Sequence, residues 1–392
     1  MSRLKIAFVS DVIYPFIKGG AEKRIYDIST RLARKGHEVH LFGVRWWDGK
    51  SPIDLDGVTV HGVCPPLRLY AGARRSLVEP AAFSAALVLH ILQFCFDLID
   101  CSEFPFLPCF GAKLAALATN VPLVVTWHEV WGAYWKEYLG KLGHCGSFVE
   151  RSVASLSDHL IAVSDKVRRD LASIGVNESS ISVIPNGIDF ESVMKTQASY
   201  QAFDLFFAGR LIREKNLDLL VNAIAVLSRK HPSLTCAIVG DGPERNRLIE
   251  LARQLHVADK IAFLGTFQRH EQVISLLKSS KIFVLPSSRE GFSTVLAEAK
   301  ACKLPAVVYA GAQSAAPEMI QDGRDGLLFY QLEVEELADR IERLLSDEDL
   351  RANISDNAFE SARRYDIERI IMQVEATYRK VLEEFRRRTV RG

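Results

Sequence analysis

The sequence lacks the features of a secreted, disulfide-bonded protein. Its seven cysteines are scattered, no two of them form a C-x-x-C pair, and their number is odd. This pattern argues against a disulfide framework or a structural zinc site and is typical of a reducing cytoplasm. The first residues, MSRLKIAFVSD, lack the apolar core and cleavage site of a signal peptide and instead predict a β-strand. We therefore expect a cytoplasmic protein.

Long apolar runs are also lacking. The most apolar stretch, AAFSAALVLHILQFCF at residues 81–96, is interrupted by His90 and Gln93. It is also shorter than the roughly 20 residues that span a bilayer. We predict that this stretch forms a buried helix of an α/β domain rather than a transmembrane segment.

Charge of one sign is not in excess. The formal net charge is +1 over 392 residues, so no overall field indicates nucleic acid, and we expect no nucleic-acid partner. Two local groups of arginines leave open a peripheral contact with a membrane. They are Arg68, Arg74 and Arg75 in an apolar loop, and Arg386, Arg387, Arg388 and Arg391 at the end of the chain. Ordinary solvent-exposed segments are the alternative interpretation of both groups.

Short apolar runs alternate with longer helical patterns along the whole chain, which is typical of βαβ units around parallel sheets. In the first half we expect strands at 5–11, 38–44, 58–63, 98–103, 122–129, 159–165 and 181–185. In the second half we expect them at 204–209, 235–240, 260–265, 281–286 and 306–311. The length fits two domains. We predict an α/β fold of two Rossmann-like domains whose parallel sheets face each other across a cleft.

The domains are expected at residues 1–195 and 203–365, with the polar stretch 190–202 as the linker between them. The last helix, 366–392, has a single apolar stripe and is expected to pack back on the first domain. In the second domain, Asn216 is a candidate N-cap and Pro243 a candidate first helical residue.

The second domain carries the residues that best indicate chemistry. Arg210 and Lys215 follow the strand at 204–209, at the carboxyl edge of the sheet where α/β proteins bind ligands. Two cations at this edge suit a pyrophosphate, although surface cations are the alternative. The next strand ends in VGDGP, where Gly240 and Gly242 let the backbone turn and approach a ligand. No third glycine completes a dinucleotide fingerprint.

The segment LPSSREGFSTVLAEAKA at 285–301 adds a second kind of site. A strand leads into a loop with Glu290, and a helix is predicted from residue 292 to 301. Backbone N–H groups at such a helix start bind anions. Glu298 lies about one turn further along, among apolar residues, where its carboxylate can accept hydrogen bonds from vicinal hydroxyls. A carboxylate on each side of an anion site matches a nucleotide sugar, whose hydroxyls flank a diphosphate. Two solvated glutamates are the alternative.

Glu290 and Glu298, with seven residues between them, resemble the E-x7-E motif of retaining glycosyltransferases of family four, which have the GT-B fold. Further strings in the same order extend the resemblance over nearly the whole chain: GGAEKRIYDISTRLARKGHEV, VTWHE, IPNGID, AGRLIREKN, VGDGP and DGRDGLLF.

The resemblance implies roles for individual residues. Glu290 would contact the hydroxyls of the donor sugar, Glu298 would hold the ribose, and Arg210 and Lys215 would neutralise the diphosphate. His128 matches a histidine near the transferred sugar. The implied catalytic set is His128, Arg210, Lys215 and Glu290. The implied donor-binding set is Gly19, Gly20, Gly209, Gly240, Gly242, Gly291, Phe292, Ser293, Thr294 and Glu298.

The chain departs from the family pattern at two places. Ser293 stands where a second glycine often follows phenylalanine, and GAQSAAPEMI at 311–320 replaces the frequent G-G-x-x-E. The second loop lies near the nucleotide and the sugar in the family, so the identity of the donor stays open.

The resulting expectation is transfer of a hexose from a UDP- or GDP-sugar to a hydroxyl of a glycan, a lipid or a small molecule, with retention of configuration and no cofactor. Neither an acidic pair nor a histidine cluster suggests a bound divalent cation, so metal independence is expected. The acceptor is expected on the first domain, where the aromatic residues Trp127, Trp131, Tyr134, Trp135 and Tyr138 either stack on it or pack internally.

Other functions fit the sequence less well. A non-catalytic nucleotide-sugar-binding protein of the same fold is the main alternative. A nicotinamide-dependent dehydrogenase fits poorly, because the first loop lacks the glycine spacing and the ribose-binding acid. A sugar-nucleotide epimerase of the same fold would show a different pattern along most of the chain.

Overall fold

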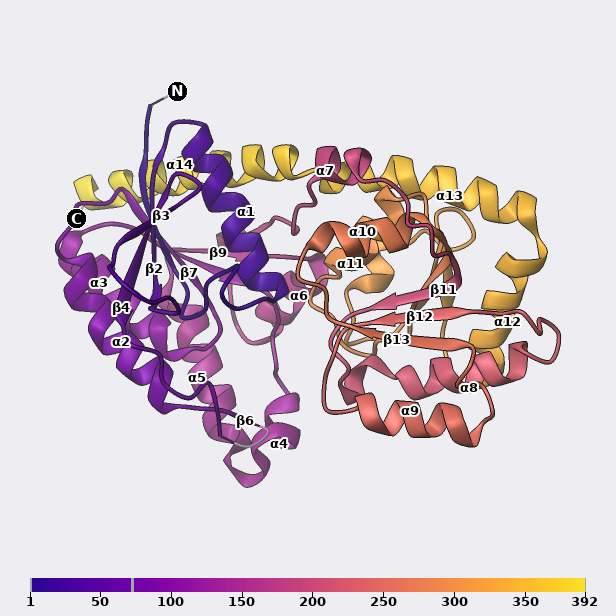
Figure 1. The fold of residues 1–392 in the computed structure, drawn as a ribbon. Helices are drawn as coiled ribbons and strands as arrows, with labels where there is room; N and C mark the ends of the chain where they lie inside the picture. The colour runs from indigo at the N-terminus through magenta and orange to yellow at the C-terminus, as the bar shows by residue number, and fades with distance from the viewer. Residues whose placement is uncertain (1, 72–73, 392) are drawn as a thin grey trace. The chain divides into compact units, whose positions relative to one another are not determined.

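The computed structural model describes residues 2–71 and 74–391, which form two compact units (Figure 1). Unit 1 comprises Met1–Gly187 and Ile367–Gly392, and unit 2 comprises Ile188–Asp366. The chain therefore leaves unit 1 after Gly187, builds the whole of unit 2, and returns to unit 1 with its last helix. The first boundary lies eight residues before the predicted end of the first domain at 195.

Unit 1 is built on an eight-stranded sheet with the order β10-β9-β8-β7-β1-β2-β4-β3. Its strands are β1 (Lys5–Val9), β2 (Glu38–Val44), β3 (Ile53–Leu55), β4 (Val58–Cys64), β7 (Leu98–Ser102), β8 (Leu123–Trp127), β9 (His159–Ala162) and β10 (Ile181–Val183). All neighbouring strands are parallel except β3, which runs antiparallel to β4. In the centre, Ile6 pairs with Val39 on one side and with Leu98 on the other. A parallel sheet is covered on both faces, which explains why these strands are almost continuously apolar.

The helices of unit 1 are α1 (Gly20–Arg34), α2 (Val78–Ile91), α3 (Leu107–Thr119), α4 (Tyr134–Leu139), α5 (Gly143–Leu156), α6 (Asp165–Ser173) and α14 (Ile367–Arg391). A short hairpin, β5 (Tyr70–Ala71) and β6 (Arg74–Arg75), precedes α2, and the 3-10 turns are η1 (Gly140–Leu142) and η2 (Glu178–Ser180).

Unit 2 has a six-stranded parallel sheet with the order β13-β12-β11-β14-β15-β16. Its strands are β11 (Phe203–Ala208), β12 (Cys236–Val239), β13 (Ile261–Gly265), β14 (Ser280–Leu285), β15 (Ala306–Tyr309) and β16 (Leu327–Phe329). Its helices are α7 (Phe190–Lys195), α8 (Leu217–Leu227), α9 (Arg245–Gln254), α10 (His270–Lys278), α11 (Thr294–Ala301), α12 (Val334–Ser346) and α13 (Glu348–Ala362). The 3-10 turns η3 (Arg213–Lys215), η4 (Ala316–Met319) and η5 (Arg363–Tyr365) complete it.

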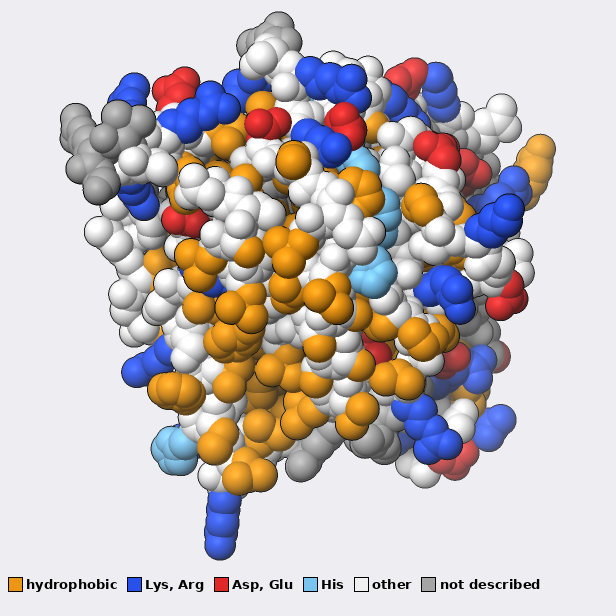
Figure 2. Space-filling view, turned by 90° about the vertical axis from the view of Figure 1, so that its left-hand side faces the viewer, with side chains coloured by type: hydrophobic (Ala, Val, Ile, Leu, Met, Phe, Trp, Pro, Cys, Tyr) orange, Lys and Arg blue, Asp and Glu red, His pale blue; other side chains and the backbone are white. Residues whose placement is uncertain are grey.

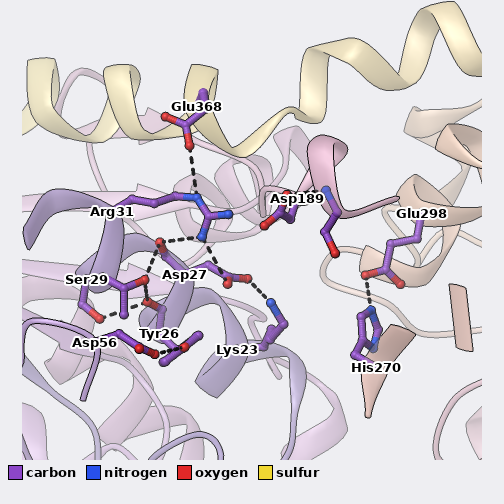
Figure 3. Close-up of polar contacts among 12 residues, drawn as sticks. Lys23, Tyr26, Asp27, Ser29, Arg31, Asp56, Asp189, His270, Glu298 and Glu368 are labelled. Atoms are coloured by element: carbon purple, nitrogen blue, oxygen red, sulfur yellow. Dashed lines mark hydrogen bonds and ion pairs between the residues drawn. The ribbon is translucent and has the colours of Figure 1, made fainter. Parts of the chain in front are cut away.

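The last helix, α14, completes the core of unit 1. Its apolar stripe, which includes Ile370 and Tyr378, belongs to the same buried cluster as Ile6 and Phe8 of β1. A charged contact joins it to α1, where Arg31 Nε lies 3.2 Å from an oxygen of Glu368 (Figure 3). Because this helix supplies part of the core, unit 1 is assembled from both ends of the chain.

The predicted linker at 190–202 is wrong in its first half. Residues 190–195 form α7, whose side chains Phe190 and Val193 are buried in the core of unit 2. Only two apolar side chains of this short helix are needed for packing, so no apolar period is visible in its sequence.

Several predicted boundaries also differ from the structure. Strands β3 and β16 and the β5–β6 hairpin were not predicted, and most predicted strands extend one or more residues too far. Asn216 occupies the N-cap position of α8, but its side chain bonds Pro286 O instead of capping the helix. Helix α9 begins at Arg245 rather than at Pro243.

The prediction of a buried helix at 81–96 is correct for one face only. Helix α2 buries Phe83, Leu87 and Ile91, but Val78 and Leu89 are about two-thirds exposed. Figure 2 shows the side of the molecule on which apolar side chains gather. In the part of the chain that the structure describes, no helix is long and apolar enough to cross a membrane.

We predict that Tyr378→Phe destabilises unit 1 by about 1 to 3 kcal/mol, because the buried Tyr378 hydroxyl donates a hydrogen bond to the buried carboxylate of Asp100. Burial raises the pKa of Asp100 to about 6 despite this bond and one from Thr126. All five tryptophans lie in unit 1, so urea unfolding followed by tryptophan fluorescence reports on this unit. Tyr200→Phe, at a fully exposed position of unit 2, serves as the control. Equal midpoints for Tyr378→Phe and the wild type would refute the prediction.

Candidate functional site

The loops that follow β11 and β12 pack closely at the carboxyl edge of the sheet of unit 2. Gly240 has φ +127°, and a Cβ built on it would lie 1.9 Å from the carbonyl oxygen of Gly209. A Cβ on Gly242 would lie 2.3 Å from Leu211 O. The backbone N–H of Leu211 donates to Asp241 O at 2.9 Å. These glycines are therefore required for the packing of the loop that carries Arg210. Arg210 itself is exposed. The predicted contact of the glycines with a ligand stays a prediction.

Lys215 and Glu290 form an ion pair at the same edge. The Lys215 Nζ lies 2.5 Å from Glu290 Oε1, and both side chains are largely buried. Two hydrogen bonds hold the loops that carry them: the Asn216 side chain donates to Pro286 O, and the backbone Ser288 N donates to Glu214 O, each at 2.9 Å. The sequence predicted both residues for the site but did not predict that they pair.

The loop that departs from the family pattern lies directly against Glu290. The backbone N–H of Ala315 donates to Glu290 O at 2.7 Å, and Glu290 N donates to Gln313 O at 3.4 Å. The backbone of the 311–320 loop therefore holds the segment with Glu290 in place, and the identity of the donor stays open.

Helix α11 begins two residues later than predicted. Ser293 is its N-cap, and the Ser293 hydroxyl oxygen accepts a hydrogen bond from Leu296 N at 3.4 Å. Phe292 and Gly291 thus belong to the preceding loop, and the Phe292 ring packs edge-on against Tyr365. Of Phe292, Ser293 and Thr294 in the implied donor-binding set, only Thr294 lies within the helix.

Glu298 is buried in α11 and meets a residue that the sequence did not predict. His270 Nε2 lies 2.7 Å from Glu298 Oε1 (Figure 3). His270 is the first residue of α10, the helix that follows β13, and reaches Glu298 from there. The position of His270 after a predicted strand was the available signal, because residues that follow parallel strands share one edge of the sheet.

The predicted residues of unit 1 lie at two places. Gly19 is the N-cap of α1 and Gly20 its first residue. A Cβ on Gly20 would meet nothing within 4 Å, so packing within the described structure does not require a glycine there. His128 follows β8, and the backbone N–H groups of His128 and Glu129 donate to Glu103 Oε1 at 2.8 and 3.2 Å.

The pKa values of His128 and Glu103 are both shifted in the direction that favours the neutral form. Burial, helped by the nearby charge of Arg24, lowers the pKa of His128 to about 3. Burial raises the pKa of Glu103 to about 8, against the effect of the two backbone bonds. His128 Nε2 and Glu103 Oε2 are buried and have no hydrogen-bond partner among the described residues. At neutral pH His128 therefore offers a neutral imidazole, and Glu103 holds the loop that carries it.

The aromatic residues proposed for an acceptor largely pack on one another. Trp127 and Trp135 are buried, and the ring centroids of Trp131 and Trp135 are 4.6 Å apart. Tyr138 contacts Trp131 edge-on, with centroids 5.0 Å apart. This cluster supports the alternative interpretation, internal packing, for Trp127 and Trp135.

No group of three or more His, Cys, Asp or Glu side chains is placed to hold a metal ion in residues 2–71 and 74–391. Metal independence of the reaction nevertheless stays a prediction.

Two family models match the chain and assign its class. The model described as Glycosyltransferase Family 4 matches residues 18–192, and the model described as Glycosyl transferases group 1 matches residues 191–361. These matches identify the chain as a glycosyltransferase, and its two parallel-sheet α/β domains have the GT-B fold. The two models together match residues 18–361, which confirms the predicted glycosyltransferase family and fold class.

Individual relatives cover most of the chain. A subunit of the phosphatidylinositol N-acetylglucosaminyltransferase of Schizosaccharomyces pombe is 28% identical over 86% of this chain and 72% of its own length. An uncharacterised glycosyltransferase of Methanocaldococcus jannaschii is 26% identical over 91% and 92%.

Solved structures share the fold. The sucrose-phosphate synthase of Thermosynechococcus elongatus matches with a TM-score of 0.81 at 20% identity, over 97% of this chain and 100% of its own. An Anabaena protein in complex with UDP and glucose matches with a TM-score of 0.75 at 22% identity, over 96% and 99%.

We predict that Glu103→Gln changes the pH dependence of the stability of unit 1. The ordinary pKa of a glutamate is 4.5, and in the folded protein that of Glu103 is about 8. The folded state thus keeps a proton that the unfolded state loses. The stability that this proton contributes is present below pH 4.5 and is lost as the pH rises toward 8.

The unfolding free energy of the wild type relative to Glu103→Gln should therefore fall by about 1 to 3 kcal/mol between pH 5 and pH 8. Urea unfolding followed by tryptophan fluorescence at several pH values measures it. Glu137→Gln, at an exposed position of α4, provides the matched control. A difference that stays constant with pH would show that Glu103 is ionised in the folded protein.

Proposed function

We propose that this glycosyltransferase moves a hexose from a UDP- or GDP-sugar to a hydroxyl of a glycan, a lipid or a small molecule, with retention of configuration and without a metal ion. The observation that carries the proposal is the Lys215–Glu290 ion pair at the carboxyl edge of unit 2, where Lys215 shares the loop after β11 with Arg210. The complexes of the Anabaena protein with UDP and with UDP-glucose support a nucleotide sugar as the donor.

The charges at this edge suit departure of a nucleoside diphosphate. The leaving group gains negative charge as the anomeric bond breaks, and cations held in place lower the barrier where that charge develops. A lysine ammonium has three donors, so Lys215 can keep its bond to Glu290 and still contact a phosphate oxygen. Glu290 retains accepting capacity for sugar hydroxyls, and Arg210 supplies the second cation.

Glu298 suits the nucleoside end of the same donor. Its carboxylate is buried and held by His270, and a carboxylate accepts hydrogen bonds from two vicinal hydroxyls. The roles that the resemblance assigns to His128 and to Gly19 and Gly20 belong to this proposal as well. A neutral His128 would not repel the positive charge that develops on the transferred sugar.

For the acceptor we propose only a class of compounds, namely glycans, lipids or small molecules with a hydroxyl. The phosphatidylinositol named for the relative from Schizosaccharomyces pombe supports a lipid among the candidates. A non-catalytic nucleotide-sugar-binding protein is the second candidate function. It would be expected to lose one of Arg210, Lys215, Glu290 or Glu298, and all four are present.

A donor screen tests the proposal. UDP-, GDP- and ADP-sugars are incubated with the folded protein, with and without glycan and lipid acceptors, and release of nucleoside diphosphate is measured. We expect release with a UDP- or GDP-sugar that increases when the correct acceptor is added. Donor binding without release would favour the non-catalytic alternative, and the absence of both would contradict the proposed function.

In the same assay, Lys215→Ala should lower turnover by about 100-fold, because a cation facing the leaving diphosphate is removed. Lys281→Ala is the matched control: Lys281 also forms an ion pair, 2.8 Å from Asp204, but at the beginning of β14 and so at the opposite edge of the sheet. Equal turnover of the two variants would exclude Lys215 from the diphosphate site.

A further inference from the structure

Three helices of unit 1 present a common apolar surface to solvent. Large side chains between 44% and 72% exposed lie on or directly after α2, α3 and α5, and we call them the outer face. They are Val78, Leu89, Leu92, Leu114, Leu117 and Phe148. Helix α2 packs on α3, and α3 packs on α5, so the three helices are contiguous. Figure 2 shows apolar side chains gathered over this side of the molecule.

An apolar surface of this kind needs a partner. Single exposed leucines are ordinary, but contiguous apolar patches beyond a few hundred Å² mark interaction sites on soluble proteins. The buried faces of the same helices already fill the core: α2 uses Phe83 and Leu87 there, and α3 uses Ala112 and Ala115. The outer face is therefore additional to what folding requires.

The charges of these helices are distributed asymmetrically. Their acidic residues, Glu79 of α2 and Glu150 of α5, are buried. Glu79 accepts from Arg75 at 3.2 Å, and Glu150 accepts from the backbone of Trp131 at 2.6 Å. The exposed charged side chains on α5 and in the turn before it are basic.

These basic residues are Lys141, His144 and Arg151. The outer face is thus apolar with a cationic margin. The half-buried Lys113 of α3 differs, because its Nζ lies 3.7 Å from Asp158.

The geometry points to an anionic lipid surface as the partner of the outer face. Leucine and phenylalanine side chains enter the acyl boundary, while lysine and arginine remain at the level of the charged headgroups. A second copy of the chain is the other occupant to weigh. In a two-fold dimer the face would meet itself, so the cations at its margin would oppose like charges. Charge complementarity therefore favours lipid.

This surface differs from the one that the sequence indicated. The arginine loop at 68–75 was considered for membrane contact, but Arg75 is tied to the buried carboxylates of Asp11 and Glu79. The side chain of Arg74 lies outside the described residues. Lipid binding by the outer face does not depend on the transfer reaction, so this binding can be tested without a sugar donor.

Co-sedimentation with vesicles tests the inference. The whole protein is mixed with vesicles of phosphatidylcholine, alone or with one-third phosphatidylglycerol. We expect binding to the anionic vesicles that exceeds binding to the neutral ones by roughly fivefold or more for each cation engaged, and that weakens at high salt. Failure to bind either kind of vesicle would overturn the inference.

Substitutions distinguish lipid binding by the outer face from binding by another surface and from formation of a dimer. Leu89→Ser combined with Leu117→Ser should abolish binding, whereas Met372→Ser, at an exposed position of α14, should not. Lys141→Glu combined with Arg151→Glu should remove only the preference for anionic vesicles. Binding by the double serine variant equal to that of the wild type would overturn the inference. So would a concentration-dependent dimer, seen by analytical ultracentrifugation, that the serine substitutions dissociate.

A second inference concerns His270 and rests on the proposed function. We infer that His270 is a positioning residue that orients the Glu298 carboxylate for ribose hydroxyls. The bond of 2.7 Å occupies Oε1 from the α10 side, and Glu298 lies among the buried residues Leu296, Ala297 and Ala299. The Glu298 side chain has three rotatable bonds, and its contact with His270 restricts rotation about them.

Binding of nucleoside diphosphates with and without ribose hydroxyls isolates this role. UDP, GDP and ADP are titrated by calorimetry beside their 2′,3′-dideoxy forms. His270→Ala should weaken binding of the natural nucleotide by about tenfold and leave binding of its dideoxy form unchanged. His270→Gln, which keeps an N–H donor, should restore most of the loss.

His231→Ala is the matched control. His231 Nε2 also lies 2.7 Å from a carboxylate oxygen, that of Glu342, in the same unit but away from the carboxyl edge. An equal loss for natural and dideoxy nucleotides, or no loss at all, would overturn the role of His270 alone. A wild type that binds none of the nucleotides would overturn the proposed function as well, so the two failures are distinguishable.

Discussion

The packing of helices on both faces of each parallel sheet is the constraint on which the rest of the structure depends. Covered strands are largely apolar, and residues such as Phe206 of β11 and Val284 of β14 are fully buried. Charged side chains that must reach a ligand are left to the loops after the strands. Because parallel strands all end at one edge, Arg210 and Lys215 from the loop after β11 lie at the same edge as Glu290 from the loop after β14.

At that edge the backbone itself determines the geometry. Gly240 and Gly242 allow two loops to approach more closely than any side chain would permit, and the resulting hydrogen bond between Leu211 and Asp241 holds the segment with Arg210. Glu290 is held in turn by the backbone of the 311–320 loop. The loop in which the chain departs from the family pattern therefore contacts Glu290 through backbone hydrogen bonds.

Much of the fold could be predicted, because apolar strands and amphipathic helices leave a clear period in the sequence. The missed features are those that depend on contacts between distant loops. The pairing of Lys215 with Glu290, 75 residues apart, and the contact of His270 with Glu298 follow only from the strand order. Glu103 was missed for the same reason. The start of α11 shifted because Ser293 caps the helix, a local choice that the apolar pattern does not record.

The side chains at the carboxyl edges of the two sheets differ in charge between unit 1 and unit 2. In unit 1 burial raises the pKa of Glu103 and lowers the pKa of His128, so both side chains are neutral at pH 7. In unit 2 Lys215 and Glu290 form an ion pair and Arg210 is exposed. A diphosphate needs fixed cations, whereas a sugar centre that becomes positive is best served by a neighbour without positive charge. Burial, together with the nearby positive charge of Arg24, lowers the pKa of His128 and so keeps its imidazole neutral.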